Sequence, residues 1–143
     1  MRATVSLGER YLWVDSLCII QDNPHDKNAQ MSHTDAIYSS AFVTIAAASG
    51  SHADAGLAGV SRPRDVAQRT ALIDGLRYSI PMTGYMSVIS DPALVWNSRG
   101  WTFLEKVLSK RLLVFTGYQV YFQCSNMIWC EDTDGNGGKS ERK

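Results

Sequence analysis

Apolar residues along the chain form short continuous runs separated by stretches with helical spacing, a pattern that predicts an α/β fold. Residues 11–15 (YLWVD) and 42–48 (FVTIAAA) are runs rich in aromatic, β-branched and small apolar residues, as in buried strands of a parallel or mixed sheet. Between them, apolar residues recur at helical spacing from Asp26, which can cap a helix, to about Ser40. A strand, a helix and a second strand joined by short links predict a βαβ unit.

The remaining pattern predicts a hairpin, two further helical segments and three more strands. Residues 70–80 (TALIDGLRYSI) place two β-rich runs around Asp74-Gly75, which predicts an inserted hairpin with a type I′ turn. Residues 49–69 are expected to form a loop, and residues 81–91 to be irregular. The other elements are a helix ending near Gly8, a helix over 101–110 and strands over 112–115, 119–124 and 127–130.

Length and composition limit the classes of function. The 143 residues fit one domain, which we place at 1–131, and the polar tail 132–143 is expected to be disordered. Lys+Arg and Asp+Glu balance at 14 each, so no overall basic field favours nucleic acid, and no apolar run is long enough to span a membrane. Three cysteines without a signal peptide predict a reduced, cytoplasmic or nuclear protein.

Most motifs of common active sites are absent. The three histidines and three cysteines lack the spacing of a metal site, and neither a phosphate-binding glycine loop nor a serine-hydrolase elbow occurs. Cys18 follows Asp15 and Ser16 near the predicted end of a strand. It is either a nucleophile or a packed core residue, and the preference of free cysteine for burial favours the core.

Glu105 is the most informative polar residue, and it has two interpretations. In the structural one, Thr102 and Glu105 form a T-x-x-E capping box, Arg99 is a surface residue and Trp101 anchors the core. In the functional one, Trp101 stacks a ring of a nucleotide, Arg99 meets a phosphate and Glu105 stabilises a cation developing on a ribose.

Three segments together resemble the fungal heterokaryon-incompatibility (HET) domain. They are YLWVDSLCIIQD (11–22), IYSSAFVTIAAASG (37–50) and NSRGWTFLEKVLSKRLLVF (97–115), in the order of that family, and the resemblance covers about residues 5 to 124. It implies a cytoplasmic role in fungal non-self recognition, in which the domain is an effector of a cell-death reaction. Implied partners are other protein domains or chains, with self-association among them, and neither nucleic acid nor a membrane.

The HET family also looks distantly similar to Toll/interleukin-1 receptor (TIR) domains, which have a flavodoxin-like sheet. Some TIR domains cleave NAD with a glutamate in a W-C-x-x-E helix, with which residues 101–105 (WTFLE) align. The resemblance therefore makes Glu105 the candidate catalytic residue, with Trp101, Arg99 and Asp15 as nucleotide-binding candidates. Asp15 enters because it follows a predicted strand, where α/β proteins form binding crevices. No resident cofactor or metal is implied, and NAD would be a substrate.

The chain departs from the family pattern in ways that define the alternatives. Leu104 replaces the usual glutamine, Phe122-Gln123-Cys124 replaces W-E-C, and the first strand of the family is missing from the sequence. We therefore expect a flavodoxin/TIR-like sheet that lacks its first strand, with two neighbours unpaired. The hypotheses are a signalling and interaction module, an NAD glycohydrolase using Glu105, and an inactive fragment.

Overall fold

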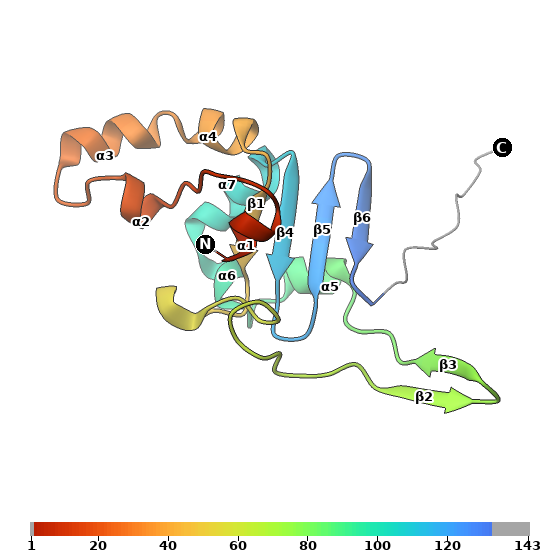
Figure 1. Cartoon of the computed structure of the whole chain (residues 1–143). Coiled ribbons are helices and arrows are strands. Elements are labelled where there is room, and N and C mark those ends of the chain that lie inside the picture. Colours follow the sequence, from red (N-terminus) through yellow and green to blue (C-terminus); the bar gives the residue numbers. More distant parts are fainter. Residues whose placement is uncertain (1, 133–143) are drawn as a thin grey trace.

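The computed structural model describes residues 2–132 and contains one main sheet, a separate hairpin and short helices (Figure 1). The helices are α1 (Arg2–Ser6), α2 (Asp15–Cys18), α3 (Pro24–Met31), α4 (Thr34–Ser40), α5 (Tyr85–Ser90), α6 (Val95–Ser98) and α7 (Gly100–Leu108), with a 3₁₀ turn at Ala53–Ala55. The strands are β1 (Thr44–Ala47), β2 (Thr70–Ile73), β3 (Leu76–Ser79), β4 (Arg111–Phe115), β5 (Val120–Cys124) and β6 (Met127–Cys130).

The main sheet has the order β1-β4-β5-β6 and is mixed. β1 pairs with β4 in parallel, whereas β4, β5 and β6 form an antiparallel meander. The crossover between β1 and β4 contains α5, α6 and α7. Parallel strands require such a long connection, while the meander needs only tight turns. The α/β prediction is confirmed in this form, and the flavodoxin-like order stays a prediction.

One face of the sheet holds the core. The cross-strand row Ala46–Val114–Tyr121–Cys130 lies on this face, and its first three side chains are almost fully buried. Tyr85 and Val88 of α5 and Trp96 of α6 complete the same cluster. The rings of Tyr85 and Tyr121 lie 5.8 Å apart. Burial of these aromatic and aliphatic side chains is the main source of stability in this half of the molecule.

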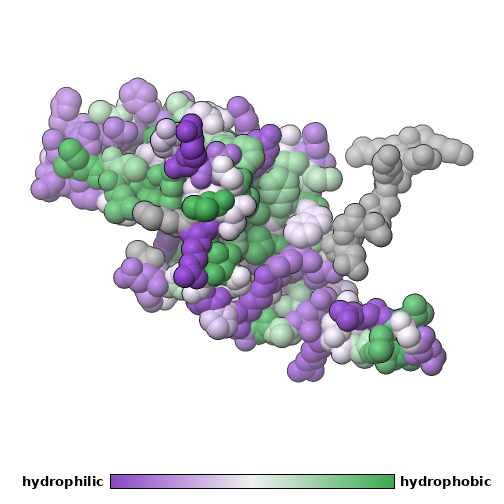
Figure 2. Space-filling view, viewed as in Figure 1, coloured by the Kyte–Doolittle hydropathy of each residue, from purple (hydrophilic) through white to green (hydrophobic). Residues whose placement is uncertain are grey.

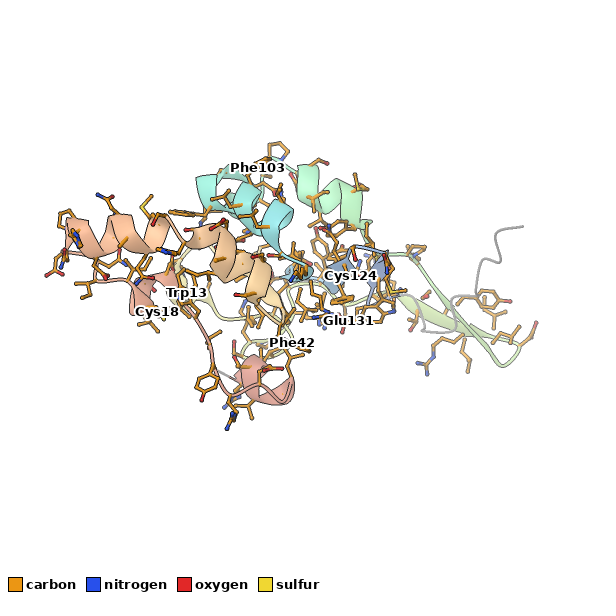
Figure 3. All side chains as sticks on the ribbon, turned by 90° about the horizontal axis from the view of Figure 1, so that it is seen from above. Trp13, Cys18, Phe42, Phe103, Cys124 and Glu131 are labelled. Atoms are coloured by element: carbon orange, nitrogen blue, oxygen red, sulfur yellow. The ribbon has the colours of Figure 1, made fainter. Side chains whose placement is uncertain are left out.

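The opposite face of the sheet is also apolar but has less cover. The row Ile45–Leu113–Phe122–Trp129 crosses all four strands on this side. Figures 1 and 3 show α1 on this side beside β1 and β4, and none of the described helices lies over β5 and β6 there. Figure 2 shows apolar atoms gathered over β4 and β5 in the same view. Met127 is 59% and Trp129 39% exposed, so this face, here called the open sheet face, meets solvent at its β6 end.

The predicted hairpin is confirmed as β2 and β3, which pair only with each other. Asp74 (φ 51°) and Gly75 (φ 78°) both have positive φ, as a type I′ turn requires. The hairpin projects from the body of the molecule (Figure 1), and all its residues are exposed. Its apolar side chains therefore contribute little to the core.

The loop before the hairpin, residues 49–69, is hydrogen-bonded to the end of β6. The Arg64 guanidinium donates two hydrogen bonds of 2.6 Å to the Glu131 carboxylate and one to the Tyr118 carbonyl. Gly117 allows the close approach of Asp65, whose carboxylate would clash with any Cβ at that position. The predicted loop over residues 49–69 is thus ordered by charge-assisted hydrogen bonds.

The predicted strand over residues 11–15 is wrong. Residues 11–14 have no regular structure, Asp15 begins α2, and Tyr11 is 83% exposed. A strand needs a hydrogen-bonding neighbour, and β1 pairs instead with β4. The predicted βαβ unit is therefore absent, and the parallel pair is made by strands much further apart in the sequence. For the same reason Cys18, expected in the core, lies exposed on α2 (Figure 3).

The structure corrects some of the remaining predictions and confirms others. The helix expected from Asp26 is divided into α3 and α4, and Asn23 is the N-cap because its side chain accepts from the His25 and Asp26 amides; Asp26 accepts instead from the Ile20 amide. The segment expected to be irregular contains α5. The helix near Gly8 (φ 77°), α7 and the three C-terminal strands are confirmed. The proposed tail lies outside the described residues from position 133 onward, and Asp132 hydrogen-bonds the Met82 amide.

Candidate functional site

A cavity of about 120 Å³ lies between the N-terminal segment, the α3–α4 pair and the start of α7. Its lining combines aromatic, apolar and polar side chains from all of these parts. The residues are Trp13, Asp15, Ile19, Gln21, Lys27, Met31, Thr34, Tyr38 and Trp101. Two of the predicted site residues, Asp15 and Trp101, thus share one cavity although they are far apart in the sequence.

Asp15 lines the cavity from α2, a helix that the sequence pattern did not predict. It is the first residue of α2, and its carboxylate accepts a hydrogen bond of 2.7 Å from the Ser16 amide. The reasoning that placed it at the end of a strand was wrong, because no strand forms there. Asp15 lines the cavity from the start of α2, and its role in binding stays a prediction.

Glu105 is half-buried in the second turn of α7 and is held by a tryptophan. Its Oε2 accepts a hydrogen bond of 2.7 Å from Nε1 of Trp96, which is 3% exposed. Burial raises the pKa of Glu105 above its ordinary value, and the Asp15 charge acts in the same direction. The Trp96 hydrogen bond and the Arg99 charge partly oppose this rise. A carboxyl group with a raised pKa is the type that proteins use for proton transfer, and it is equally compatible with a structural anchor.

Arg99 lies at the N-cap of α7 and is exposed. It lines a second hollow of about 200 Å³, with His52 and Leu57 among its neighbours, and is not a lining residue of the first cavity. The structure therefore brings Asp15 and Trp101 to one cavity, sets Glu105 within electrostatic range of Asp15 and Arg99, and places Arg99 on a separate hollow.

The expected capping box is wrong. Thr102 lies inside α7 rather than at its N-cap, and it is 1% exposed. Its hydroxyl donates to the Trp96 carbonyl, and the Glu105 carboxylate binds the indole of the same tryptophan. Thr102 and Glu105 therefore fix Trp96 from two sides. Lys106 adds a third contact, since its ammonium lies 4.5 Å from the centre of the Trp96 ring.

Two aromatic residues of the cavity were missed by sequence reasoning. Trp13 and Tyr38 meet edge to face with ring centres 6.4 Å apart, and Figure 3 shows Trp13 in the N-terminal segment beside α4. Burial, followed by the charges of Glu105 and Asp15, raises the pKa of Tyr38 to about 12. The available signal was the aromatic content of the segments YLWVD and IYSS, which the predicted strand and helix had assigned to the core.

Within residues 2–132, no group of three or more His, Cys, Asp or Glu side chains is placed to hold a metal ion. No described helix has the length and apolar character needed to cross a bilayer. The Cys18 sulfur accepts from the Val14 amide at 3.5 Å, a contact within one turn of chain that offers no general base.

Among known proteins, the chain matches the sequence model of one family but no individual protein. No curated protein and no solved structure matches the chain. The sequence model described as heterokaryon incompatibility protein (HET) matches residues 1–105, a range that includes the whole cavity lining and Glu105. The chain therefore belongs to the heterokaryon incompatibility (HET) family.

Proposed function

We propose that this chain is a heterokaryon incompatibility effector that signals by associating with other protein chains. The family membership supports a function related to incompatibility. The proposed association rests on the open sheet face. A row of apolar side chains runs across the four strands of this face, and Met127 and Trp129 at its β6 end are exposed. Apolar patches of this kind mark protein contact sites.

The total surface of the molecule supports the same proposal. The accessible surface is 10457 Å², whereas a compact monomer of this mass exposes roughly 7,300 Å². Association is the way for such a surface to leave water.

Sedimentation velocity over a range of concentrations tests this proposal. We expect the wild-type chain to associate, alone or with an added partner domain, and Trp129→Glu to weaken that association because a charge enters the open sheet face. Leu72→Glu is the matched control, since Leu72 is 73% exposed on the separate hairpin. A wild-type chain that stays monomeric with every partner, or a Leu72→Glu effect equal to that of Trp129→Glu, contradicts the proposal.

Cleavage of NAD at Glu105 is the second candidate function. It is favoured by the half-buried carboxyl with a raised pKa beside a cavity that contains Trp101. The developing oxocarbenium ion at the ribose would gain from a nearby carboxylate. The cavity of about 120 Å³ is small beside the roughly 300 Å³ or more of usual ligand sites, so it would hold one ring of the nucleotide and leave the remainder outside.

Nicotinamide release from NAD decides this second candidate. The enzyme hypothesis expects turnover by the purified chain that is abolished in Glu105→Gln. The Gln side chain keeps an oxygen to accept the Trp96 hydrogen bond, so loss of activity would not follow from loss of that contact. Absence of turnover in a folded, associated sample would reject the enzyme hypothesis for this chain.

A further inference from the structure

Three aromatic side chains line the cavity and leave part of their surface to solvent. Trp13 and Tyr38 form a corner, with an angle of 72° between their planes, and Trp101 lines the same space. Trp13 is 36% and Trp101 39% exposed. Three aromatic side chains that line one small volume are the components of an aromatic cage.

Two carboxyl groups lie near these rings. Asp15 lines the cavity, and the two charges that act on Tyr38 are the carboxylates of Asp15 and Glu105, which add to the effect of burial in raising its pKa. Lys27 also lines the cavity, so one ammonium offsets part of this negative charge. The electron-rich faces of the rings add a further attraction for positive charge.

Three cations of the described chain are stacked on other rings. Arg10 lies over Tyr11, Lys106 over Trp96 and Arg111 over Phe42, at 4.5 to 5.4 Å from the ring centres. Within residues 2–132, no lysine or arginine is stacked on Trp13, Tyr38 or Trp101. The cage rings are thus available to a cation from outside the chain.

We propose that this cavity binds a small quaternary ammonium compound of the size of choline through Trp13, Tyr38, Trp101 and Asp15. A volume of about 120 Å³ suits one compact alkylammonium group. The lining residues come from helices and irregular segments rather than from strands, so the lining offers a peptide no strand edge to pair with, which favours a free small molecule. This site lies apart from the open sheet face, and it is the same cavity that would hold one ring of the nucleotide in the NAD candidate.

Isothermal titration of the full chain with choline tests the cation requirement. The matched probe is 3,3-dimethyl-1-butanol, in which a neutral carbon replaces the nitrogen of choline. We expect choline to bind and the neutral probe to bind on the order of tenfold more weakly, the loss of a desolvated cation–π contact. Equal affinities, or no choline binding at millimolar concentration, would overturn the proposal.

Substitutions locate the site. Trp101→Leu should weaken choline binding on the order of tenfold. Asp15→Asn should also weaken choline binding. Trp129 is an exposed tryptophan outside the cavity, so Trp129→Leu should leave choline binding unchanged.

Circular dichroism confirms that each variant is folded. If Trp101→Leu does not fold, the comparison of choline with the neutral probe on the wild-type chain tests the proposal. Equal losses in Trp101→Leu and Trp129→Leu would place binding elsewhere. Tighter binding of a trimethyllysine peptide, by tenfold or more, would overturn the small-molecule assignment.

Discussion

Glu105 experiences burial and a hydrogen bond that act on its pKa in opposite directions, and burial prevails. A carboxyl group whose pKa is raised in the folded state stabilises the fold most at low pH, below its unfolded pKa. That contribution is lost as the pH rises through the folded pKa. Ionised Glu105 at neutral pH is therefore less favourable for the fold than neutral Glu105.

Glu105→Gln should remove this pH dependence. The substitution keeps an acceptor for Trp96 and abolishes ionisation, so we expect unchanged or higher stability at pH 7.5 and little change at pH 4. Urea unfolding at the two pH values, compared with the wild type, measures the effect. A variant that is less stable at pH 7.5 than the wild type would show that the charge of Glu105 supports the fold.

Thr102 is the buried hydroxyl that holds the Trp96 carbonyl. Thr102→Val keeps the shape of the side chain and leaves that carbonyl without its side-chain donor, which costs about 1–3 kcal/mol of unfolding free energy. Thr102→Ser keeps the hydroxyl and should retain more of the stability despite the lost methyl group. Denaturant unfolding of both variants checks this order, and a Thr102→Val variant as stable as the wild type would contradict the role given to the hydroxyl.

At the scale of elements, the β2–β3 hairpin differs from the strands of the main sheet. It pairs only with itself and its residues are exposed, and an isolated two-stranded hairpin is marginally stable in water. We expect the amides of β2 and β3 to exchange with deuterium orders of magnitude faster than those of β4 and β5. Exchange followed by mass spectrometry measures this, and protection of the hairpin equal to that of β4 would indicate a partner on its surface.

The Arg64–Glu131 pair should fix the loop before the hairpin to β6. Burial alone would raise the pKa of Glu131, but the hydrogen bonds from Arg64 and the Val120 amide outweigh it and lower the pKa. A lowered carboxyl pKa gives stability that is present above the unfolded pKa and is lost as pH falls through the folded one. We expect Arg64→Met to make residues 56–69 sensitive to proteolysis at pH 7, with little difference from the wild type at acid pH. Equal resistance at pH 7 would contradict this.

Elements fixed by neighbouring residues were predictable, and those fixed by distant partners were not. The Asp74-Gly75 turn determines its hairpin locally, and the strands of the meander follow each other closely in sequence. The run at residues 11–15 has the composition of a strand, but it can form one only if it pairs with a strand from a distant part of the sequence. For α5, Tyr85 and Val88 gave a helical spacing that two serines in a six-residue segment obscured.

The same distinction applies to the candidate site. Trp101 and Glu105 lie in one helix, so their closeness to each other was predictable from the sequence. Trp13 and Tyr38 join Trp101 only through tertiary packing, so no local pattern predicts that these three residues line one cavity. Arg99 is next to this helix in sequence but lines another hollow, because successive residues at a helix start point in different directions.

At the scale of the whole molecule, the apolar surface and the family membership lead to one functional account. The chain belongs to the HET family, and its open sheet face gives a physical reason for association with other chains. The alternative is that the incompatibility reaction depends on NAD cleavage at Glu105. These two accounts predict opposite results for substitutions at Trp129 and Glu105, which are separate positions on different elements.

Viability of fungal cells that express the chain is the most direct test of the central claim. Death on expression of the wild type, of Leu72→Glu and of Glu105→Gln, with survival on expression of an equal amount of Trp129→Glu, is the result that association through the open sheet face predicts. Survival with Glu105→Gln and death with Trp129→Glu would contradict that account and assign the effect to Glu105.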